Sequence, residues 1–447
     1  MSADSTVTKT LWQYSETLPG ETMEFLKGIA SDYCKVRNYV YGKYSGIKNV
    51  NSLTPVYSIL NEMRYCGLRE QLNLPSVYYE LAITDAVADI KSNWEIVKDK
   101  IGAKITSNEN LSDDDRLYLR TVLKIGSVYA AILNYEEYEM PKKAENLAID
   151  TKRLNNFLRR LTRRNLVMPK AGKADWFRIS PNGYSYRDGA IRIACRVPRR
   201  RIEIPLRDDR VFDRQIRVNI KENAVVLAIP AKTKMKKHKD YTNTVYIHIG
   251  NRDMFTLSNG HIYGKSLDSL TNPETERLAR KNRERRRLYT AYEQNAESGN
   301  LLKAGNIEKN NLGRCKYDRQ KEKERHRTET FINSEINRMF REEKPFRVVI
   351  ARPVVKNRTK IYSKTVNRRL SRSFGGFVRE RLAYKCRVNS IELVEITSRG
   401  TGKVCSICGA EGKRQGLEFE CGSCGFKSCI AINSAKNIQK KYNGYNG

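Results

Sequence analysis

Two closely spaced pairs of cysteines constrain the fold of this chain more than any other feature. Cys405 and Cys408 form the first pair, and Cys421 and Cys424 form the second, after twelve intervening residues. Each pair can wrap one side of a tetrahedral ion, so that four thiolates fill the coordination shell of zinc. A glycine follows the second cysteine of each pair, where such a knuckle turns tightly. The spacing therefore predicts a structural zinc site without catalytic role, in preference to a redox pair or a chance arrangement.

The other cysteines indicate a reducing compartment. Of ten cysteines, five lie in the last 45 residues and five are scattered singly, whereas a secreted disulfide framework spreads them through a short chain. We expect the scattered five to be small, mostly buried residues. The opening MSADSTVTKT has neither a basic nor an apolar signal region. The longest apolar stretch, 224–229, is far shorter than the roughly 20 residues of a membrane span, so we expect a cytosolic protein.

The charge of the chain indicates a polyanionic partner. Lys and Arg number 84 and Asp and Glu number 50, so the formal net charge is +34. Nucleic acid is the leading partner and an anionic membrane surface is the competing one. Charged runs often only solvate a helix face, but 152–164 contains no acid and 277–287 contains only Glu284. The candidate phosphate-binding residues are Lys152, Arg153, Arg159, Arg160, Arg163, Arg164, Arg199, Arg200, Arg201, Arg277, Arg280, Lys281, Arg285, Arg286 and Arg287.

The hydrophobic pattern changes period along the chain. A short strand is predicted at 6–14, and helical spacing dominates from about 20 to 165. Ser76 is a candidate helix cap after Pro75, and Ser112 with Asp115 resembles a capping box. Tyr79, Ile83, Ala86, Val87, Ile90 and Trp94 share one helical face and are predicted to be core residues.

From about 174 to 247 the period is two, which predicts a small antiparallel barrel or sandwich. Asn182-Gly183 and Asp188-Gly189 are turn signals within it. The remaining pattern predicts an α/β unit. Its expected elements are a hairpin (245–264), a basic helical hairpin (273–342), a strand (346–355), a helix (about 365–385) and a strand (390–396).

Several segments resemble one protein family. GTGKVCSICG, FECGSCG and INSAKNI resemble the closing segment of TnpB transposon proteins and of miniature type V (V-F-like) CRISPR effectors. IHIGNRDMFTLSNG (247–260) and FRVVIARP (346–353) resemble the first two RuvC motifs of that family, and RLAYKC (381–386) resembles the helix before its ribbon. The resemblance covers about 245–440 and is only architectural before that.

The resemblance implies an α+β multidomain fold. A helical recognition lobe is inserted in an oligonucleotide-binding-like β-barrel wedge domain, and an RNase H-like (RuvC) α/β domain with an embedded zinc ribbon follows. The implied domains are the first wedge strand (1–19), the recognition lobe (20–168), the wedge barrel (169–243), the RuvC-like domain (244–400) with its basic hairpin (273–342), the zinc ribbon (401–428), and the last RuvC helix and tail (429–447).

The chain departs from the family where the family performs its chemistry. RuvC domains resemble two-metal nucleases, in which carboxylates hold two divalent cations close together. The first Asp of the family falls on His248, the second-motif Glu on Ala351 with its acidic neighbour at Arg352, and the last Asp on Ala431. A methyl group cannot bind a metal, and imidazole is a poor ligand for Mg²⁺. The resemblance therefore predicts a nuclease-dead RuvC domain with no catalytic residue, with zinc as its cofactor and no catalytic Mg²⁺.

Three alternatives stay open at this stage. Asp253, Glu392 or Glu395 could rebuild a shifted site, although several acids would have to meet in close register. The alanines could be engineered, but His248 and Arg352 would be unusual choices for that. The alignment with the family could also slip.

The resemblance implies a guide RNA, a double-stranded DNA target opened into an R-loop, and two copies of the chain on one guide. Without cleavage, target occupancy could control transcription by blocking RNA polymerase, or by recruiting polymerase or a sigma factor. The alternatives are an RNA-guided endonuclease with a shifted or residual site and an unguided basic zinc-ribbon RNA-binding protein. The expected location is the cytosol or nucleoid of a bacterium or archaeon, away from membranes.

Overall fold

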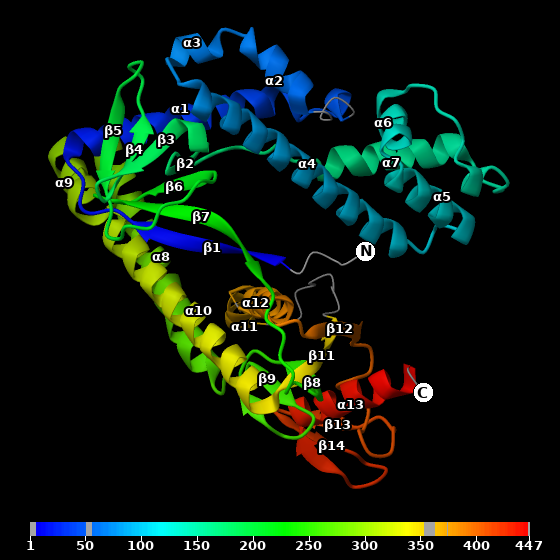
Figure 1. The fold of residues 1–447 in the computed structure, drawn as a ribbon. Helices are drawn as coiled ribbons and strands as arrows, with labels where there is room; N and C mark the ends of the chain where they lie inside the picture. Colours follow the sequence, from blue (N-terminus) through cyan, green and yellow to red (C-terminus); the bar gives the residue numbers. More distant parts are fainter. Residues whose placement is uncertain (1–5, 51–55, 353–362, 373, 446–447) are drawn as a thin grey trace. The chain divides into compact units, whose positions relative to one another are not determined.

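The computed structural model describes residues 6–50, 56–352, 363–372 and 374–445 (Figure 1). The predicted segments 1–19 and 429–447, and the second motif at Pro353, therefore extend in part outside the described residues. The chain divides into two units, Thr8–Lys232 and a second unit that runs mainly from Thr233 onward. Each unit is described separately below.

The first unit begins with a strand and continues as a helical lobe. Along α4, all six positions of the predicted apolar stripe are buried, which confirms it as core. Burying each large side chain of this kind stabilises the fold by roughly 1.5–3 kcal/mol. The helices are α1 (Gly20–Tyr44), α2 (Val56–Arg64), α3 (Leu68–Leu72), α4 (Ser76–Thr106), α5 (Asp113–Lys124), α6 (Gly126–Asn134) and α7 (Thr151–Asn165).

One of the two predicted helix caps is confirmed. The Asp115 amide donates to Ser112 Oγ at 3.1 Å, and the Ser112 amide donates to Asp115 Oδ2 at 3.2 Å, which completes the capping box of α5. The prediction for Ser76 is wrong, because Ser76 is already the first helical residue of α4. Pro75 takes the extended cap position, and its carbonyl accepts from the amides of Tyr78 and Tyr79.

Two small antiparallel sheets complete this unit and confirm the predicted alternation. Ile216 and Val218 are fully buried while Arg217 between them is exposed. Asp188 and Gly189 both have positive φ, 50° and 71°, and form the predicted turn between β3 and β4. The first sheet has the order β1 (Thr6–Tyr14), β7 (Val225–Lys234), β6 (Ile216–Ile220), β2 (Trp176–Ile179); the second has the order β3 (Tyr184–Arg187), β4 (Ala190–Ala194), β5 (Arg201–Pro205).

The helical lobe lies in the chain between β1 and β2, which are members of the same sheet. A bridge between Ser15 and Leu206 links the end of β1 to the end of the second sheet. This insertion of helices into a barrel-like β domain is the arrangement expected from the sequence.

The second unit is built on a mixed sheet with the order β10-β9-β8-β11-β12. Strands β8, β11 and β12 are parallel, and helices connect them, as parallel strands require. This mixed sheet, the two preceding antiparallel sheets and the helices between their strands confirm the predicted α+β fold class. The elements are β8 (Asn243–Ile249), β9 (Phe255–Leu257), β10 (Ile262–Tyr263), α8 (Leu267–Glu297), α9 (Leu301–Asn311), α10 (Cys315–Glu343), β11 (Pro345–Arg352), α11 (Lys364–Ser371), α12 (Gly375–Val388), β12 (Glu392–Thr397), β13 (Lys413–Gln415), β14 (Glu418–Glu420), β15 (Lys427–Cys429) and α13 (Ile430–Tyr445).

Two helical predictions in this unit need correction. The basic segment forms three helices, because the Gly- and Asn-containing segments SGN (298–300) and NNLG (310–313) each interrupt it. Its first helix begins at Leu267 and has Pro273 inside it. The single helix predicted at about 365–385 is two helices, α11 and α12. The second begins at the pair Gly375-Gly376, and glycine has low helix propensity.

The scattered cysteines also differ from expectation. Only Cys386 is buried, and the other four are half-buried or exposed, so they are not mainly core residues.

Candidate functional site

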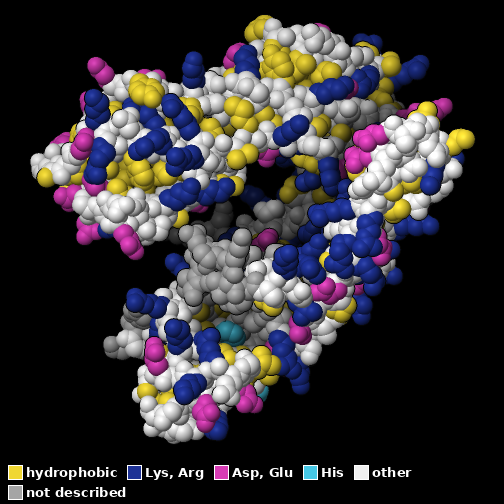
Figure 2. Space-filling view, turned by 180° about the vertical axis from the view of Figure 1, so that it is seen from behind, with side chains coloured by type: hydrophobic (Ala, Val, Ile, Leu, Met, Phe, Trp, Pro, Cys, Tyr) yellow, Lys and Arg dark blue, Asp and Glu magenta, His cyan; other side chains and the backbone are white. Residues whose placement is uncertain are grey.

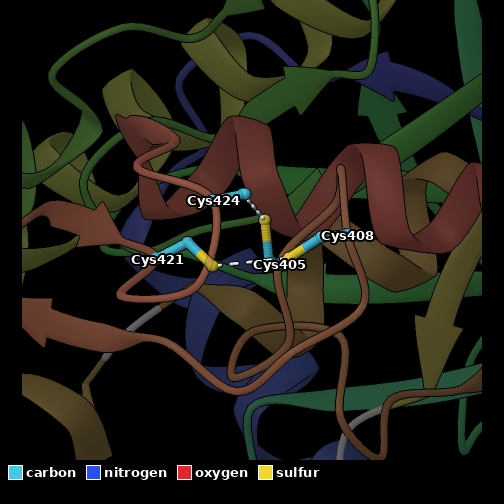
Figure 3. A group of neighbouring side chains, drawn as sticks. All are labelled: Cys405, Cys408, Cys421 and Cys424. Atoms are coloured by element: carbon cyan, nitrogen blue, oxygen red, sulfur yellow. Dashed lines mark hydrogen bonds between the residues drawn. The ribbon is translucent and has the colours of Figure 1, made fainter.

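The four predicted zinc ligands come together in the structure. The sulfur atoms of Cys405 and Cys424 are 3.7 Å apart, those of Cys408 and Cys421 are 3.5 Å apart, and all four lie within 4.8 Å of one another. Figure 3 shows the four side chains turned toward one another. Four sulfurs around a tetrahedral zinc ion, each about 2.3 Å from the metal, would be about 3.8 Å apart. The donor set and its spacing therefore fit a closed zinc site.

Both knuckles have the same backbone design. The Gly409 amide donates to the Cys405 carbonyl at 3.0 Å, and the Gly425 amide donates to the Cys421 carbonyl at 3.0 Å. Both glycines have positive φ, 82° and 71°, a conformation that an L side chain would strain. Backbone amides, that of Cys424 first, lower the pKa of the Cys421 thiol to about 6. This thiol is thus prepared to bind a cation as a thiolate.

The ribbon is held against α13 by two buried asparagines of the predicted INSAKNI segment. Asn433 accepts from the Ser406 amide at 2.8 Å and donates to the Val404 carbonyl at 2.9 Å. Asn437 donates to the carbonyls of Thr401 and Val404. Both side chains project from α13 and form hydrogen bonds with backbone groups at and before the first knuckle. We therefore expect the ribbon and α13 to fold and unfold together.

The residues at the three family carboxylate positions lie on elements that pack together. Ile247 of β8 is paired with Ile350 of β11, so His248 and Ala351 follow side by side on neighbouring parallel strands. Helix α13, whose second residue is Ala431, packs against β8, β9 and β11. None of these three side chains carries an oxygen that could bind a hard cation.

The surroundings of His248 are cationic. Burial, then Arg379 of α12 and Arg414 of β13, lower the pKa of His248 to about 4. Arg379 also donates to the Ala351 carbonyl at 3.0 Å, which brings a guanidinium onto the second-motif strand. Arg352 lies one residue further along this strand. A site that holds two divalent cations needs negative charge, and the residues here supply positive charge.

Each of the three acids that could rebuild a shifted site already has a partner, and the partner of Glu395 is Arg352 of the second motif itself. Asp253 accepts from the Ser266 amide at 2.8 Å, Glu392 pairs with Arg347 at 2.7 Å, and Glu395 pairs with Arg352 at 3.0 Å. Glu392 and Glu395 are separated by an odd number of positions along β12, so their side chains leave opposite faces of the sheet. These acids do not form a cluster that could hold two metal ions.

We expect His248 to stay neutral down to about pH 4, because burial and the two arginines oppose its protonation. Unfolded chains take up this proton near pH 6.5, so the folded state should lose up to about 3 kcal/mol as the pH falls from about 6.5 to 4. NMR titration of the imidazole ring protons would measure the pKa of His248. The spectrum of His248→Gln would identify the signal among the four histidines, and a midpoint near the ordinary value would contradict the expectation.

The basic segment of α7 lies mainly on the surface. Leu154, Leu158 and Leu161 are buried on one side of the helix. Arg153 pairs with the buried Asp115 at 2.8 Å, and Arg159 donates to the Ile132 carbonyl. The four other predicted cations are exposed: Lys152, Arg160, Arg163 and Arg164.

Arg199, Arg200 and Arg201 lie at the turn between β4 and β5, where all three are exposed. Arg199 has a positive φ of 64°, and Arg201 donates to Ser185 Oγ at 3.1 Å. The turn thus presents three cations in a short span.

The predicted cations of α8 divide into two groups. Arg277 pairs with Glu274 through two contacts of 2.6 and 2.8 Å, and Arg285 donates to the carbonyls of Leu312 and Gly313. The Arg277–Glu274 pair lies within α8, whereas Arg285 links α8 to the turn that follows α9. Arg280, Lys281, Arg286 and Arg287 are exposed, although Lys281 pairs with Glu284. Figure 2 shows Lys and Arg side chains gathered along α8 and α10.

Sequence reasoning missed three residues of these sites: Arg379, Arg414 and Tyr135. Arg379 and Arg414 reach the His248 region from α12 and from the ribbon. Tyr135 lies beside the α7 cations at the end of α6. No spacing rule connects any of them to the motifs, so only the fold could reveal them.

Comparison with known proteins supports the family resemblance in one segment. Residues 376–438 match the profile of the family described as "Cas12f1-like, TNB domain". This match confirms the resemblance to miniature type V CRISPR effectors that was predicted from the sequence. No curated protein sequence matches the chain. None of the described helices combines the length and apolar character needed to cross a membrane.

Three solved structures illustrate what the chain matches at low sequence identity. One is a Cas12f1–sgRNA–target DNA complex, with 14% identity over 97% of this chain and 98% of that chain and a TM-score of 0.28. Another is a CRISPR-Cas12f ternary complex, with 15% identity over 97% and 98% and a TM-score of 0.30. A third is CasPhi-2 (Cas12j) bound to crRNA and phosphorothioate DNA, with 10% identity over 97% and 91% and a TM-score of 0.45.

Proposed function

We propose that this chain is an RNA-guided protein that binds double-stranded DNA in a sequence-specific manner without cutting it. Base pairing between guide and target strand would read the sequence, and the protein would hold the heteroduplex backbone. The four thiolates of the ribbon would hold a structural zinc ion. Occupancy of the target would control transcription by blocking RNA polymerase, or by recruiting polymerase or a sigma factor, with one or two copies of the chain on each guide.

The observation that carries the loss of cleavage is the cationic character of the RuvC-like site. His248 and Ala351 lie side by side where the resemblance places two metal-binding carboxylates. The positive charges of Arg379 and Arg414 lie close enough to His248 to lower its pKa, and they would repel divalent cations at this site. The nearby acids Asp253, Glu392 and Glu395 already have other partners.

Guided binding is supported by the matched segment and by the distribution of charge. Residues 376–438 match a family named for a Cas12f1-like effector. The net charge of +34 favours a large polyanionic partner, and exposed cations occur on α7, on the β4–β5 turn and on α8. An unguided RNA-binding protein would share this charge, but it would not need a RuvC-like sheet joined to this ribbon.

The first experiment identifies the RNA that co-purifies with the intact protein. Sequencing should recover a uniform species with a constant part and a variable targeting end. A random sample of cellular RNA would contradict guided binding and favour the unguided alternative.

The second experiment tests cleavage with that recovered RNA as the guide. The complex, given a duplex that matches the guide and Mg²⁺ or Mn²⁺, should protect the matched sequence from a footprinting reagent and leave both strands intact. A guide with a scrambled targeting end serves as the control and should give no footprint. Specific cleavage products that depend on the metal ion and the guide would overturn the inactive assignment and support the endonuclease alternative.

A further inference from the structure

A groove on the helical lobe combines one exposed aromatic ring with a set of arginines. It has a volume of about 420 Å³ and lies where the end of α6 meets α7. None of its described lining residues is acidic. They are Tyr135, Arg153, Asn156, Arg159, Arg160 and Arg163.

Tyr135 is held in an unusual backbone conformation. It ends α6 with φ 62° and ψ 30°, the left-handed region that glycine or asparagine normally occupies at the end of a helix. A bulky side chain in this region is uncommon and costs energy. The helix end explains why this position is left-handed, but it does not explain a tyrosine that is 65% exposed.

One face of the Tyr135 ring is backed by a fixed guanidinium. The Arg159 guanidinium lies 3.9 Å from the ring centroid, and it is oriented by the Ile132 carbonyl at 2.6 Å and by Asn156 Oδ1 at 2.9 Å. Arg163 donates to the Tyr135 hydroxyl at 3.3 Å. These contacts hold the ring in place before any ligand arrives, while its large exposed area leaves room for a second flat group.

The charges around the ring suit phosphate. Arg153 is paired with Asp115, but Arg160 and Arg163 are exposed and have no carboxylate partner within the described chain. A flat apolar surface beside unpaired arginines is complementary to a nucleobase attached to a charged backbone. Bases inside a duplex are covered on both faces, so only an unpaired base could stack here. Unpaired bases are most common in the loops and bulges of folded RNA.

We infer that this groove binds an unpaired nucleotide of RNA, with its base stacked on Tyr135 and its phosphates contacted by Arg160 and Arg163. The inference rests on the proposed function, because it assigns the groove to the RNA partner. Stacking does not distinguish strongly among bases, so the site would hold the RNA in place without reading its sequence.

Photo-crosslinking to the full-length protein tests the site directly. The probe is a uridine oligoribonucleotide about ten nucleotides long that contains 5-iodouridine, which crosslinks to an aromatic side chain on which it stacks. We expect mass spectrometry to find the crosslink in the peptide that contains Tyr135. Crosslinks confined to other peptides, or stronger labelling by the matching deoxyribonucleotide, would overturn the assignment to RNA at this groove.

A binding measurement gives an independent readout. Tyr135→Asn removes the ring but keeps a residue that tolerates the left-handed conformation, so the helix end should remain intact. We expect the affinity for the RNA probe to fall about tenfold or more. An abasic probe with the same phosphates should bind the variant and the unaltered protein equally.

Tyr65→Asn is the matched control, because Tyr65 is 89% exposed and lies outside the groove. If Tyr135→Asn lowers the affinity for the abasic probe as much as the affinity for the normal probe, stacking on Tyr135 is excluded. None of these probes needs a guide or a DNA target. The absence of a crosslink at Tyr135 would therefore contradict only the RNA site proposed here, and not guided DNA binding. The absence of a guided footprint would contradict guided DNA binding, but it would not change the crosslinking result.

Discussion

Replacing Cys421 with serine is expected to yield a protein that has lost its zinc ion and whose residues 401–429 are unfolded. A hydroxyl cannot replace a thiolate in a closed four-sulfur site, and apparent zinc-binding free energies in small ribbons are about 10–16 kcal/mol. Apart from its hydrogen bonds with α13, the ribbon has only a small apolar core, whose buried residues are Phe419, Cys405 and Cys421. Elemental analysis should find about one zinc per chain before the substitution and a small fraction of that after it.

The extent of unfolding follows from the contacts of the ribbon. Hydrogen exchange should rise over 401–429 and at the start of α13, because Asn433 bonds directly to the first knuckle. Exchange in α1 and α4 should not change, since those helices belong to the other unit.

Cys429→Ser is the matched control, because this fifth thiol is exposed and lies outside the four-cysteine cluster. This variant should keep its zinc ion and its protection from hydrogen exchange over residues 401–429. Full zinc content in Cys421→Ser would show that the cluster does not hold the metal.

Features of the fold with a short sequence period could be predicted. The two knuckles depend on cysteines three positions apart, and the alternation of Ile216, Arg217 and Val218 reports directly which face of a strand is buried. The capping box at Ser112 was predictable for the same reason, since its two partners are only three residues apart.

Features that depend on distant residues could not be predicted. Arg379 lies in a helix and Arg414 in the ribbon, and no spacing relates either of them to His248. The sequence could show that carboxylates are missing from the motif positions and that Arg352 replaces one acid, but only the fold shows that Arg379 and Arg414 add further positive charge there. Likewise, a run of arginines on α8 does not reveal that Arg285 binds backbone carbonyls of a neighbouring turn.

The largest effect on nucleic-acid binding is expected when four arginines of α8 are replaced together by glutamine: Arg280, Arg283, Arg286 and Arg287. All four are exposed. Each phosphate contact contributes about 0.9 to the slope of log affinity against log salt, so four lost contacts lower that slope by up to about 3.6. The variant should therefore bind much more weakly at low salt, and rising salt should weaken it far less. Between about 50 and 200 mM salt, its affinity should fall by about two orders of magnitude less than that of the unaltered protein.

The measurement is a salt titration of affinity for duplex DNA and for RNA, with circular dichroism to check that the helices persist. Glutamine keeps good helix propensity, so α8 should remain folded. Arg277→Gln is the matched control, because this arginine already pairs with Glu274 and should leave the salt slope unchanged. A fourfold variant with an unaltered slope would show that this face of α8 is only solvated. The polyanion would then bind elsewhere, through the exposed cations of α7 and of the β4–β5 turn.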